Sequence, residues 1–369
     1  MCNQPIRVAH IMGKMVSGGV ESVVMNYYRN IDKRNLQFDF IVDEDSTYIP
    51  RDEIENMGGR VILVPPYQKI FSYIKKLKMT FKENEYKIVH SHLNTISVFS
   101  LYAARIAKVP VRIAHSHSTS NKKERKKNIL KNILKPFSKV NATHYFCCSE
   151  LAGRWLFGDK EYDNNKVKLI NNAIDIDKFI YNEKIREEIR KEIKVENKLV
   201  IGHIGRFVEQ KNHIGLLEIF YEIHKENKET VLLLVGDGPL LNVIKEKVKT
   251  FNLQDNVIFL GKRNDVNRLM QGMDIFLLPS LYEGLPVVGV EAQASGLLCI
   301  FSDSMTKETK IIESTKFISL SKSYSLWAKE ILADYEQHKR KNTKIEVINS
   351  NFEIKTESKK LESIYINEL

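Results

Sequence analysis

The chain of 369 residues is longer than one ordinary hydrophobic core supports, so two domains are expected. Its 43% hydrophobic and 28% charged content is that of a globular protein and excludes a disordered chain. No apolar run reaches the roughly 18 residues of a membrane span, and the N-terminal segment lacks the pattern of a signal peptide. The four cysteines have neither disulfide-scaffold nor zinc-site spacing. These features predict a soluble, intracellular protein.

The net charge of +11 is concentrated in the first half of the chain. Residues 122–139 hold eight Lys or Arg against one Glu, and residues 69–87 hold six Lys against two Glu. A face with this charge suits nucleic acid, an anionic membrane or a polyanionic substrate.

Short β-rich runs alternate with helical patterns along most of the chain, which predicts two consecutive βα series. In the first series, strands are expected at residues 6–12, 38–42, 60–65, 87–93, 111–117, 142–149 and 167–171. In the second series, they are expected at residues 199–205, 231–236, 256–261, 274–280, 297–302 and 316–320. The charge-rich stretch 175–198 between the series is predicted to be a linker that carries a solvated helix.

Two such series predict an α/β fold of two Rossmann-like, doubly wound domains that face each other across a cleft. We place the first domain at residues 1–178 and the second at residues 179–352. Because ligands of such sheets bind at the carboxyl ends of the strands, the chemistry is expected in the loops that follow them.

In each domain, a glycine-containing loop follows the first strand. Gly18 and Gly19 precede an amphipathic helix, whose N-terminus favours an anion, although a plain flexible loop explains the pattern equally well. In the second domain a strand ends before Arg206 and Lys211, which have the chemistry to hold a diphosphate or else lie in a solvated loop.

Further along, "VGDGP" contains Gly236 and Gly238, which either bring the backbone near a base or ribose or make a tight turn.

The segment "EGLPVVGVEA" combines a proline with two carboxylates in an apolar stretch. Pro286 suits the first helical position, which leaves the amides of Val287 and Val288 free to point at phosphate oxygens. Glu283 lies before this helix and is expected to project into the cleft; a charge that only complements the helix dipole is the alternative and explains this residue adequately. Glu291 lies one to two turns inside it, where a carboxylate accepts hydrogen bonds from a ribose diol; the alternative is a surface glutamate, but its apolar neighbours leave little polar face.

The succession of a Gly-Gly loop, "GR…K", "VGDGP", "F.G…D" and "D.F..PS..EG.P....EA.A.G" resembles the retaining glycosyltransferases of family 4, which have the GT-B fold. The resemblance covers nearly the whole chain and is most specific from Gly205 to Gly296. The phrases "VRIAHSHSTS" and "FCCSELAGRWLFG" resemble the branch that builds bacterial capsular polysaccharides and exopolysaccharides.

This resemblance implies roles for individual residues. Arg206 and Lys211 would hold the donor's diphosphate together with Gly19 and the amides of the helix after Pro286, and Glu291 would hold the ribose. Glu283 would lie beside the transferred sugar, next to the loop residues Gly284, Leu285 and Pro286.

A histidine at the end of a first-domain strand would contact the sugar from the other side. The sequence offers both His115 and His117, of which we favour His115, and a buried or turn histidine is the alternative for either. The remaining histidines show no ligand-like spacing.

The implied reaction needs no metal or cofactor. The substrate would be a nucleotide-sugar, and we expect a uridine diphosphate donor. Asp175 and Asp177 have a spacing that holds divalent cations in other transferases, but they lie where the family has its interdomain turn, and we predict no metal there. The C-terminal helix at residues 353–369 is expected, by resemblance, to cross back to the first domain.

Residues 122–139 have the pattern of an interfacial amphipathic helix, and a surface helix packed on its own domain is the alternative. Ile129, Leu130, Ile133, Leu134 and Phe137 fall on one face, with lysines around it. We therefore expect contact with an anionic membrane rather than with nucleic acid, at the cytoplasmic face of a bacterial membrane, and a lipid-linked oligosaccharide as acceptor.

Two other functions stay open. A GT-B nucleotide-sugar epimerase would turn over the donor alone, without an acceptor. A non-catalytic, basic α/β binding protein would tolerate replacement of the proposed site residues and would bind with a steep salt dependence. An oxidoreductase is least favoured because neither βα loop carries the dinucleotide fingerprint.

Overall fold

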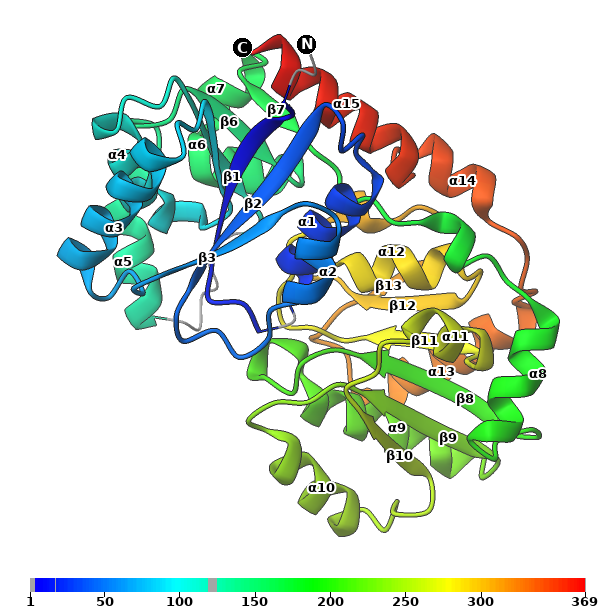
Figure 1. Ribbon diagram of the computed structural model, residues 1–369. Helices are drawn as coiled ribbons and strands as arrows, with labels where there is room; N and C mark the ends of the chain where they lie inside the picture. The colour runs from blue at the N-terminus through cyan, green and yellow to red at the C-terminus, as the bar shows by residue number, and fades with distance from the viewer. Residues whose placement is uncertain (1–3, 17, 119–124, 369) are drawn as a thin grey trace. The chain divides into compact units, whose positions relative to one another are not determined.

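The computed structural model describes residues 4–16, 18–118 and 125–368, with the backbone alone for residues 125–128. The chain forms two compact units. Residues 1–174 together with 353–369 make the first, and residues 175–352 make the second. Each has its own parallel sheet and its own hydrophobic core (Figure 1). The predicted class, two doubly wound α/β domains, is therefore confirmed.

The described residues of the first unit form a seven-stranded sheet of order β3-β2-β1-β4-β5-β6-β7. Its strands are β1 (Ile6–Gly13), β2 (Leu36–Asp43), β3 (Arg60–Val64), β4 (Ile88–Ser91), β5 (Val111–Ser116), β6 (His144–Cys147) and β7 (Val167–Leu169). Its α-helices are α1 (Gly19–Asn30), α2 (Arg51–Asn56), α3 (Ile70–Glu83), α4 (Ser97–Ile106), α5 (Arg125–Leu134), α6 (Glu150–Phe157), α7 (Asp159–Asp163) and α15 (Ile354–Asn367). All eight residues of β2 are buried, as expected for a strand covered on both faces.

The second unit has a six-stranded sheet of order β10-β9-β8-β11-β12-β13 among its described residues. Its strands are β8 (Leu199–Ile204), β9 (Thr230–Val235), β10 (Val257–Gly261), β11 (Ile275–Leu278), β12 (Leu298–Ser302) and β13 (Lys316–Ile318). Its α-helices are α8 (Glu183–Glu192), α9 (His213–Glu226), α10 (Leu241–Thr250), α11 (Val266–Gly272), α12 (Val287–Ala294), α13 (Tyr324–Gln337) and α14 (Lys344–Asn349).

The C-terminal helix α15 packs against α1 within the first unit. Glu362 accepts a hydrogen bond from the amide of Asp32 at 2.6 Å, and the hydroxyl of Ser358 donates to the carbonyl oxygen of Asn30 at 3.3 Å. Tyr365, fully buried, lies within hydrogen-bond distance of the β4 residue His90, 2.6 Å from its Nδ1. Helix α15 is thus part of the core of the first unit.

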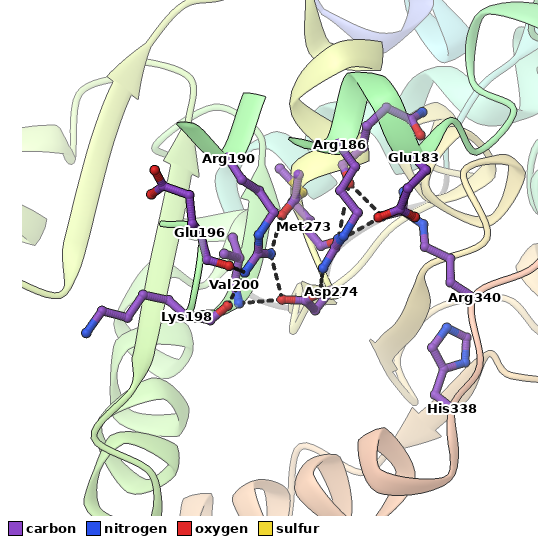
Figure 2. Close-up of polar contacts among 12 residues, drawn as sticks. Glu183, Arg186, Arg190, Glu196, Lys198, Val200, Met273, Asp274, His338 and Arg340 are labelled. Carbon is purple, nitrogen blue, oxygen red and sulfur yellow. Dashed lines mark hydrogen bonds and ion pairs between the residues drawn. The ribbon is translucent and has the colours of Figure 1, made fainter. Parts of the chain in front are cut away.

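The expectation of a solvated linker helix at residues 175–198 is wrong. Helix α8 buries Ile189 and Arg190, and Arg186 and Arg190 converge on the carboxylate of Asp274 at 2.5 and 3.1 Å (Figure 2). Asp274 also accepts a hydrogen bond from the amide of Val200, at the start of β8. The pattern misled because two of the arginines of α8 bind a buried carboxylate on one face of the helix, while its other charged side chains face water as expected.

No helix among the described residues is both long enough and apolar enough to cross a membrane.

Candidate functional site

The second sheet reverses its strand order between β8 and β11, which pair side by side. On one side of this point the order runs to β9 and β10, and on the other to β12 and β13. Open α/β sheets bind ligands in the crevice outside the carboxyl ends of the strands at such a switch point. The two loops that leave these strands, residues 205–212 and 279–286, carry six of the residues selected from the sequence: Arg206, Lys211, Glu283, Gly284, Leu285 and Pro286.

The two loops are bound to each other by a half-buried side-chain amide. Asn212 has a left-handed backbone (φ 55°), and its side chain accepts a hydrogen bond from the amide of Gly215 and caps α9. The same side chain donates to the carbonyl oxygen of Pro279 at 3.0 Å. In addition, the amide of Leu281 donates to the carbonyl oxygen of Gln210 at 2.8 Å. These contacts set the position of the cations relative to the loop that carries Glu283.

Lys211 and Glu283 form an ion pair, with the ammonium 2.6 Å from carboxylate Oε1. Their side chains are only 16% and 9% exposed, so water screens this attraction far less than at the surface. The Nε2 of Gln210 donates at 3.2 Å to the other carboxylate oxygen of Glu283. Arg206 is exposed and has no ion pair with any described residue. The site thus has one paired cation and one cation that faces solvent.

Helix α12 begins beside this pair. Pro286 is its N-cap residue, so the helix starts at Val287, one position later than the proline was expected to start it. Among the described residues none accepts a hydrogen bond from the amide of Val287 or Val288. Leu285 is 5% exposed and anchors the loop that also contains Gly284. A helix N-terminus with free amides, beside a lysine, has the chemistry of an anion site.

Glu291 lies in the second turn of α12 and differs from Glu283 in having no cationic partner among the described residues. The residue is partly exposed, but burial raises the pKa of its carboxyl to about 7. The apolar neighbours predicted from the sequence cause this shift, because Val287, Val290 and Ala292 are buried. An unpaired carboxyl at such a position is available to a ligand's hydroxyl groups.

Gly236 and Gly238 serve a close contact between two loops. A Cβ atom on Gly236, whose φ is +135°, would lie 2.1 Å from the carbonyl oxygen of Gly205. A Cβ atom on Gly238 would lie 2.7 Å from the backbone nitrogen of Phe207, whose amide donates to the carbonyl oxygen of Asp237. These glycines let the loop after β9 press against the backbone on either side of Arg206.

The first sheet has its own switch point, between β1 and β4. After β1, the amide of Gly18 donates to the carboxylate of Glu21, which also accepts from the amide of Val16 at 2.9 Å. The structure therefore gives the Gly18 amide a partner inside the chain. Gly19 has open space where a Cβ atom would lie.

His115 lies near the carboxyl end of β5 and His117 directly after it. Both belong to a larger cluster. His10 on β1, His90 on β4 and His92 just after it complete a group of five histidines, each at most 8% exposed. Burial lowers the pKa of every one of them, to about 3 for His10 and His117, so the rings are neutral at pH 7.

Three members of this cluster, His10, His90 and His92, were not predicted from the sequence. The signal was the His-x-His spacing, which occurs both in "VHSHL" and in "AHSHS". Residues two apart on a strand point to the same face, so two such pairs on neighbouring strands meet. The prediction that the remaining histidines have no ligand-like spacing is therefore wrong for His90 and His92.

The carboxylates of the Asp-x-Asp sequence each pair with a lysine. Asp175 lies 3.3 Å from Lys178, and Asp177 lies 2.6 Å from Lys344. Both belong to the turn at the start of the second unit.

Comparison with known proteins identifies both halves of the chain. Residues 17–178 match the model of "Glycosyltransferase Family 4", and residues 184–345 match that of "Glycosyl transferases group 1". The chain is 38% identical to the putative glycosyltransferase EpsF of Bacillus subtilis (strain 168) over 335 residues, which cover 88% of this chain and 86% of that protein. It is 28% identical to the Escherichia coli UDP-Gal:alpha-D-GlcNAc-diphosphoundecaprenol alpha-1,3-galactosyltransferase, over 81% of this chain and 79% of that protein.

Solved structures share the fold. Anabaena Alr3699/HepE, determined in complex with UDP and glucose, superimposes with a TM-score of 0.82 at 18% identity and covers 99% of this chain and 100% of its own. WaaG, a glycosyltransferase involved in lipopolysaccharide biosynthesis, gives a TM-score of 0.69 at 14% identity, over 97% of this chain and 99% of its own. These likenesses show the fold, and the sequence matches show that the chain is a glycosyltransferase of family 4.

Proposed function

We propose that this glycosyltransferase transfers a sugar from a UDP-sugar to a lipid-linked oligosaccharide, with retention of anomeric configuration, during synthesis of a bacterial surface polysaccharide. The names of relatives support the acceptor and the pathway class: one acts on a diphosphoundecaprenol-linked sugar, and another, from Staphylococcus aureus, is named for capsular polysaccharide biosynthesis. The UDP and UDP-glucose complexes of HepE support the donor.

The observation that carries the proposal is the meeting of Lys211, Glu283 and the start of α12 at the switch point of the second sheet. A diphosphate there would accept hydrogen bonds from the amides of Val287 and Val288 and from the ammonium of Lys211. Arg206, which is exposed, would supply a second cation. To reach the diphosphate, Lys211 would exchange one anionic partner, Glu283, for another.

The reaction would depend on stabilising the departing diphosphate. As the glycosidic bond breaks, negative charge grows on the β-phosphate, and prepositioned cations and helix amides stabilise that charge. The acceptor hydroxyl would then attack from the same face of the sugar. Glu283, released from Lys211, would contact the sugar's hydroxyl groups, and Glu291 would accept hydrogen bonds from the ribose. From the first unit, His115 or His117 would contribute the catalytic histidine.

We also propose contact with an anionic membrane through the amphipathic segment at residues 122–139. Ile129, Ile133 and Phe137 are 61%, 59% and 52% exposed, and Leu130 is 42% exposed, so an apolar face stands in water. Leu134, predicted on the same face, is instead buried at 8% exposure. Apolar side chains flanked by lysines suit the headgroup region of an anionic bilayer. Residues 122–124 lie outside the described residues.

The test is a thermal-shift screen of the purified chain with UDP-, GDP-, ADP- and CMP-sugars, followed by transfer assays on lipid-linked acceptors. We expect stabilisation by UDP-sugars and its loss in Lys211→Ala and Glu291→Ala. Lys329→Ala, which removes an exposed lysine of α13, is the matched control. Turnover of the donor without acceptor would identify an epimerase instead. Unchanged stabilisation in both site variants would contradict the proposed site.

A further inference from the structure

The five histidines of the first unit are joined by hydrogen bonds into two short chains. In one, His10 Nδ1 lies 2.9 Å from His92 Nε2, and His92 Nδ1 lies 2.9 Å from His117 Nε2. In the other, His115 Nδ1 lies 3.0 Å from His90 Nε2, and the His90 Nδ1 is 2.6 Å from the Tyr365 hydroxyl. Each contact joins one N–H or O–H donor to one lone pair.

The cluster leaves two buried ring nitrogens without a hydrogen-bond partner among the described residues, the Nε2 atoms of His10 and His115. An unpaired buried polar atom is costly, so its presence points to a ligand or to water. A cavity of about 10 Å³ beside the cluster is lined by apolar atoms, which leaves little room in it for a water molecule. The alternative to a water molecule is a small cation that the ring nitrogens bind.

Two groups of three nitrogens lie close enough to share an ion. In the inner group (His10, His90 and His92) and in the outer group (His92, His115 and His117), the three candidate ligand atoms all lie within 4.8 Å of one another. His10 of the inner group is enclosed by Phe38 and lies at 1% exposure. The outer group lies at the carboxyl ends of β4 and β5, and its member His117 is 8% exposed, so the outer group is the accessible one.

We propose that His92, His115 and His117 form a binding site for a borderline transition-metal ion, with Zn²⁺ as the representative. Three imidazoles without a carboxylate suit zinc, copper or nickel and do not suit magnesium or calcium, which take oxygen ligands. The rings are neutral, as metal ligands must be. A solvent molecule or a substrate oxygen would complete the coordination sphere.

The other two histidines of the cluster are placed to orient the ligands. If His92 binds the ion through Nδ1, its Nε2–H donates to His10 Nδ1. If His115 binds through its unpartnered Nε2, its Nδ1–H donates to His90 Nε2, and the His90 Nδ1–H then donates to the Tyr365 oxygen. His10, His90 and Tyr365 would thus fix the tautomers of the ligands, as outer-shell partners do in metal sites.

Metal binding requires one adjustment. The facing nitrogens of His92 and His117 are 2.9 Å apart, which is a hydrogen-bond distance. Two imidazoles on a tetrahedral Zn²⁺ with bonds of 2.0–2.1 Å have nitrogens about 3.4 Å apart. The pair must therefore open by about 0.5 Å, and the proton between the rings moves to His117 Nδ1.

An ion at this site would bind both His115 and His117, the two candidates for the catalytic histidine. Zinc should therefore inhibit the transferase, and a chelator should restore the activity. This consequence rests on the proposed function, whereas the binding measurements below do not use transfer activity. Failure of the zinc site is thus distinguishable from failure of the proposed transferase function.

The experiment uses the full chain after treatment with a chelator. We expect Zn²⁺ at about 100 times its dissociation constant to raise the melting temperature by roughly 5–10 °C, and Mg²⁺ to leave it unchanged. X-ray absorption of the zinc-loaded wild type should show three imidazole nitrogens at about 2.0–2.1 Å. This second measurement needs no variant, so it decides the question even if a substitution prevents folding.

Variants assign the ligands. His115→Gln and His117→Gln should each weaken zinc binding at least tenfold, whereas His224→Gln, a matched change of a half-buried histidine in the second unit, should not. Fewer than three imidazole ligands, zinc affinity that is unchanged in both variants, or equal stabilisation by Mg²⁺ would overturn the proposal.

Discussion

Glu291 should make the second unit less stable as the pH rises, and replacing it should remove this effect. Burial holds the pKa of its carboxyl at about 7 in the folded chain, against 4.5 for the ordinary group. Below pH 4.5 the group is protonated in both states and contributes nothing. Between pH 4.5 and 7 the unfolded chain ionises while the folded chain keeps its proton, so stability falls as the pH rises.

The magnitude follows from the size of the shift. A difference of about 2.5 pKa units corresponds to about 3 kcal/mol at 1.36 kcal/mol per unit, and the full penalty is present above pH 7. Because the residue is partly exposed, this value is an upper bound. Glu291→Gln keeps the size and cannot ionise, so it should be more stable than wild type by up to about 3 kcal/mol at pH 8 and by less than about 1 kcal/mol at pH 5.

The assay is urea unfolding at pH 5 and pH 8, followed by the fluorescence of Trp327. The chain has two tryptophans, and Trp155→Phe leaves the buried Trp327 as a reporter of the second unit. Glu313→Gln, in which an exposed carboxylate is removed, is the control. If Glu291→Gln and wild type differ equally at both pH values, the burial argument is refuted.

The same carboxyl links donor binding to pH. A carboxylate that accepts hydrogen bonds from a ribose diol must be ionised, so UDP affinity should fall by up to tenfold for each pH unit below 7. Calorimetric titrations between pH 5.5 and 8 measure this effect. Affinity that is flat across this range would remove Glu291 from the nucleotide site.

Three further substitutions test the remaining contacts. Glu283→Gln frees Lys211 from its 2.6 Å ion pair, so UDP should bind at least as tightly as to wild type while sugar transfer falls by at least about 100-fold; weakened UDP binding would contradict this exchange of partners. Gly236→Ala should cost several kcal/mol in urea unfolding, because its Cβ atom would lie 2.1 Å from a carbonyl oxygen, and Gly19→Ala, with open space around it, should cost little. Asp274→Asn leaves the buried Arg190 and the half-buried Arg186 without their carboxylate and should lower the unfolding free energy by about 3–5 kcal/mol; a loss below about 1 kcal/mol would show that the network adds little.

The amino-acid sequence by itself predicts the framework of this protein. All thirteen strands of the described residues fall where strands were expected, and the fully buried ones, such as β9, β11 and β12, are written as nearly continuous apolar segments because both of their faces are covered. Arg206, Lys211 and Glu283 also lie where expected, between the carboxyl end of a strand and the next α-helix, and Glu291 lies inside α12 as expected. This local information identifies Arg206, Lys211, Glu283 and Glu291 as members of one candidate site.

The tertiary structure decides which of these side chains meet. Lys211 and Glu283 pair across two loops at the switch point of the second sheet, and two arginines on one face of the charged helix α8 bind a buried carboxylate. The histidine cluster likewise depends on the sheet order, which places β4 between β1 and β5. Local periodicity shows which face a residue occupies, but only strand pairing determines which distant residues share that face, and the chemistry of both candidate sites arises from that pairing.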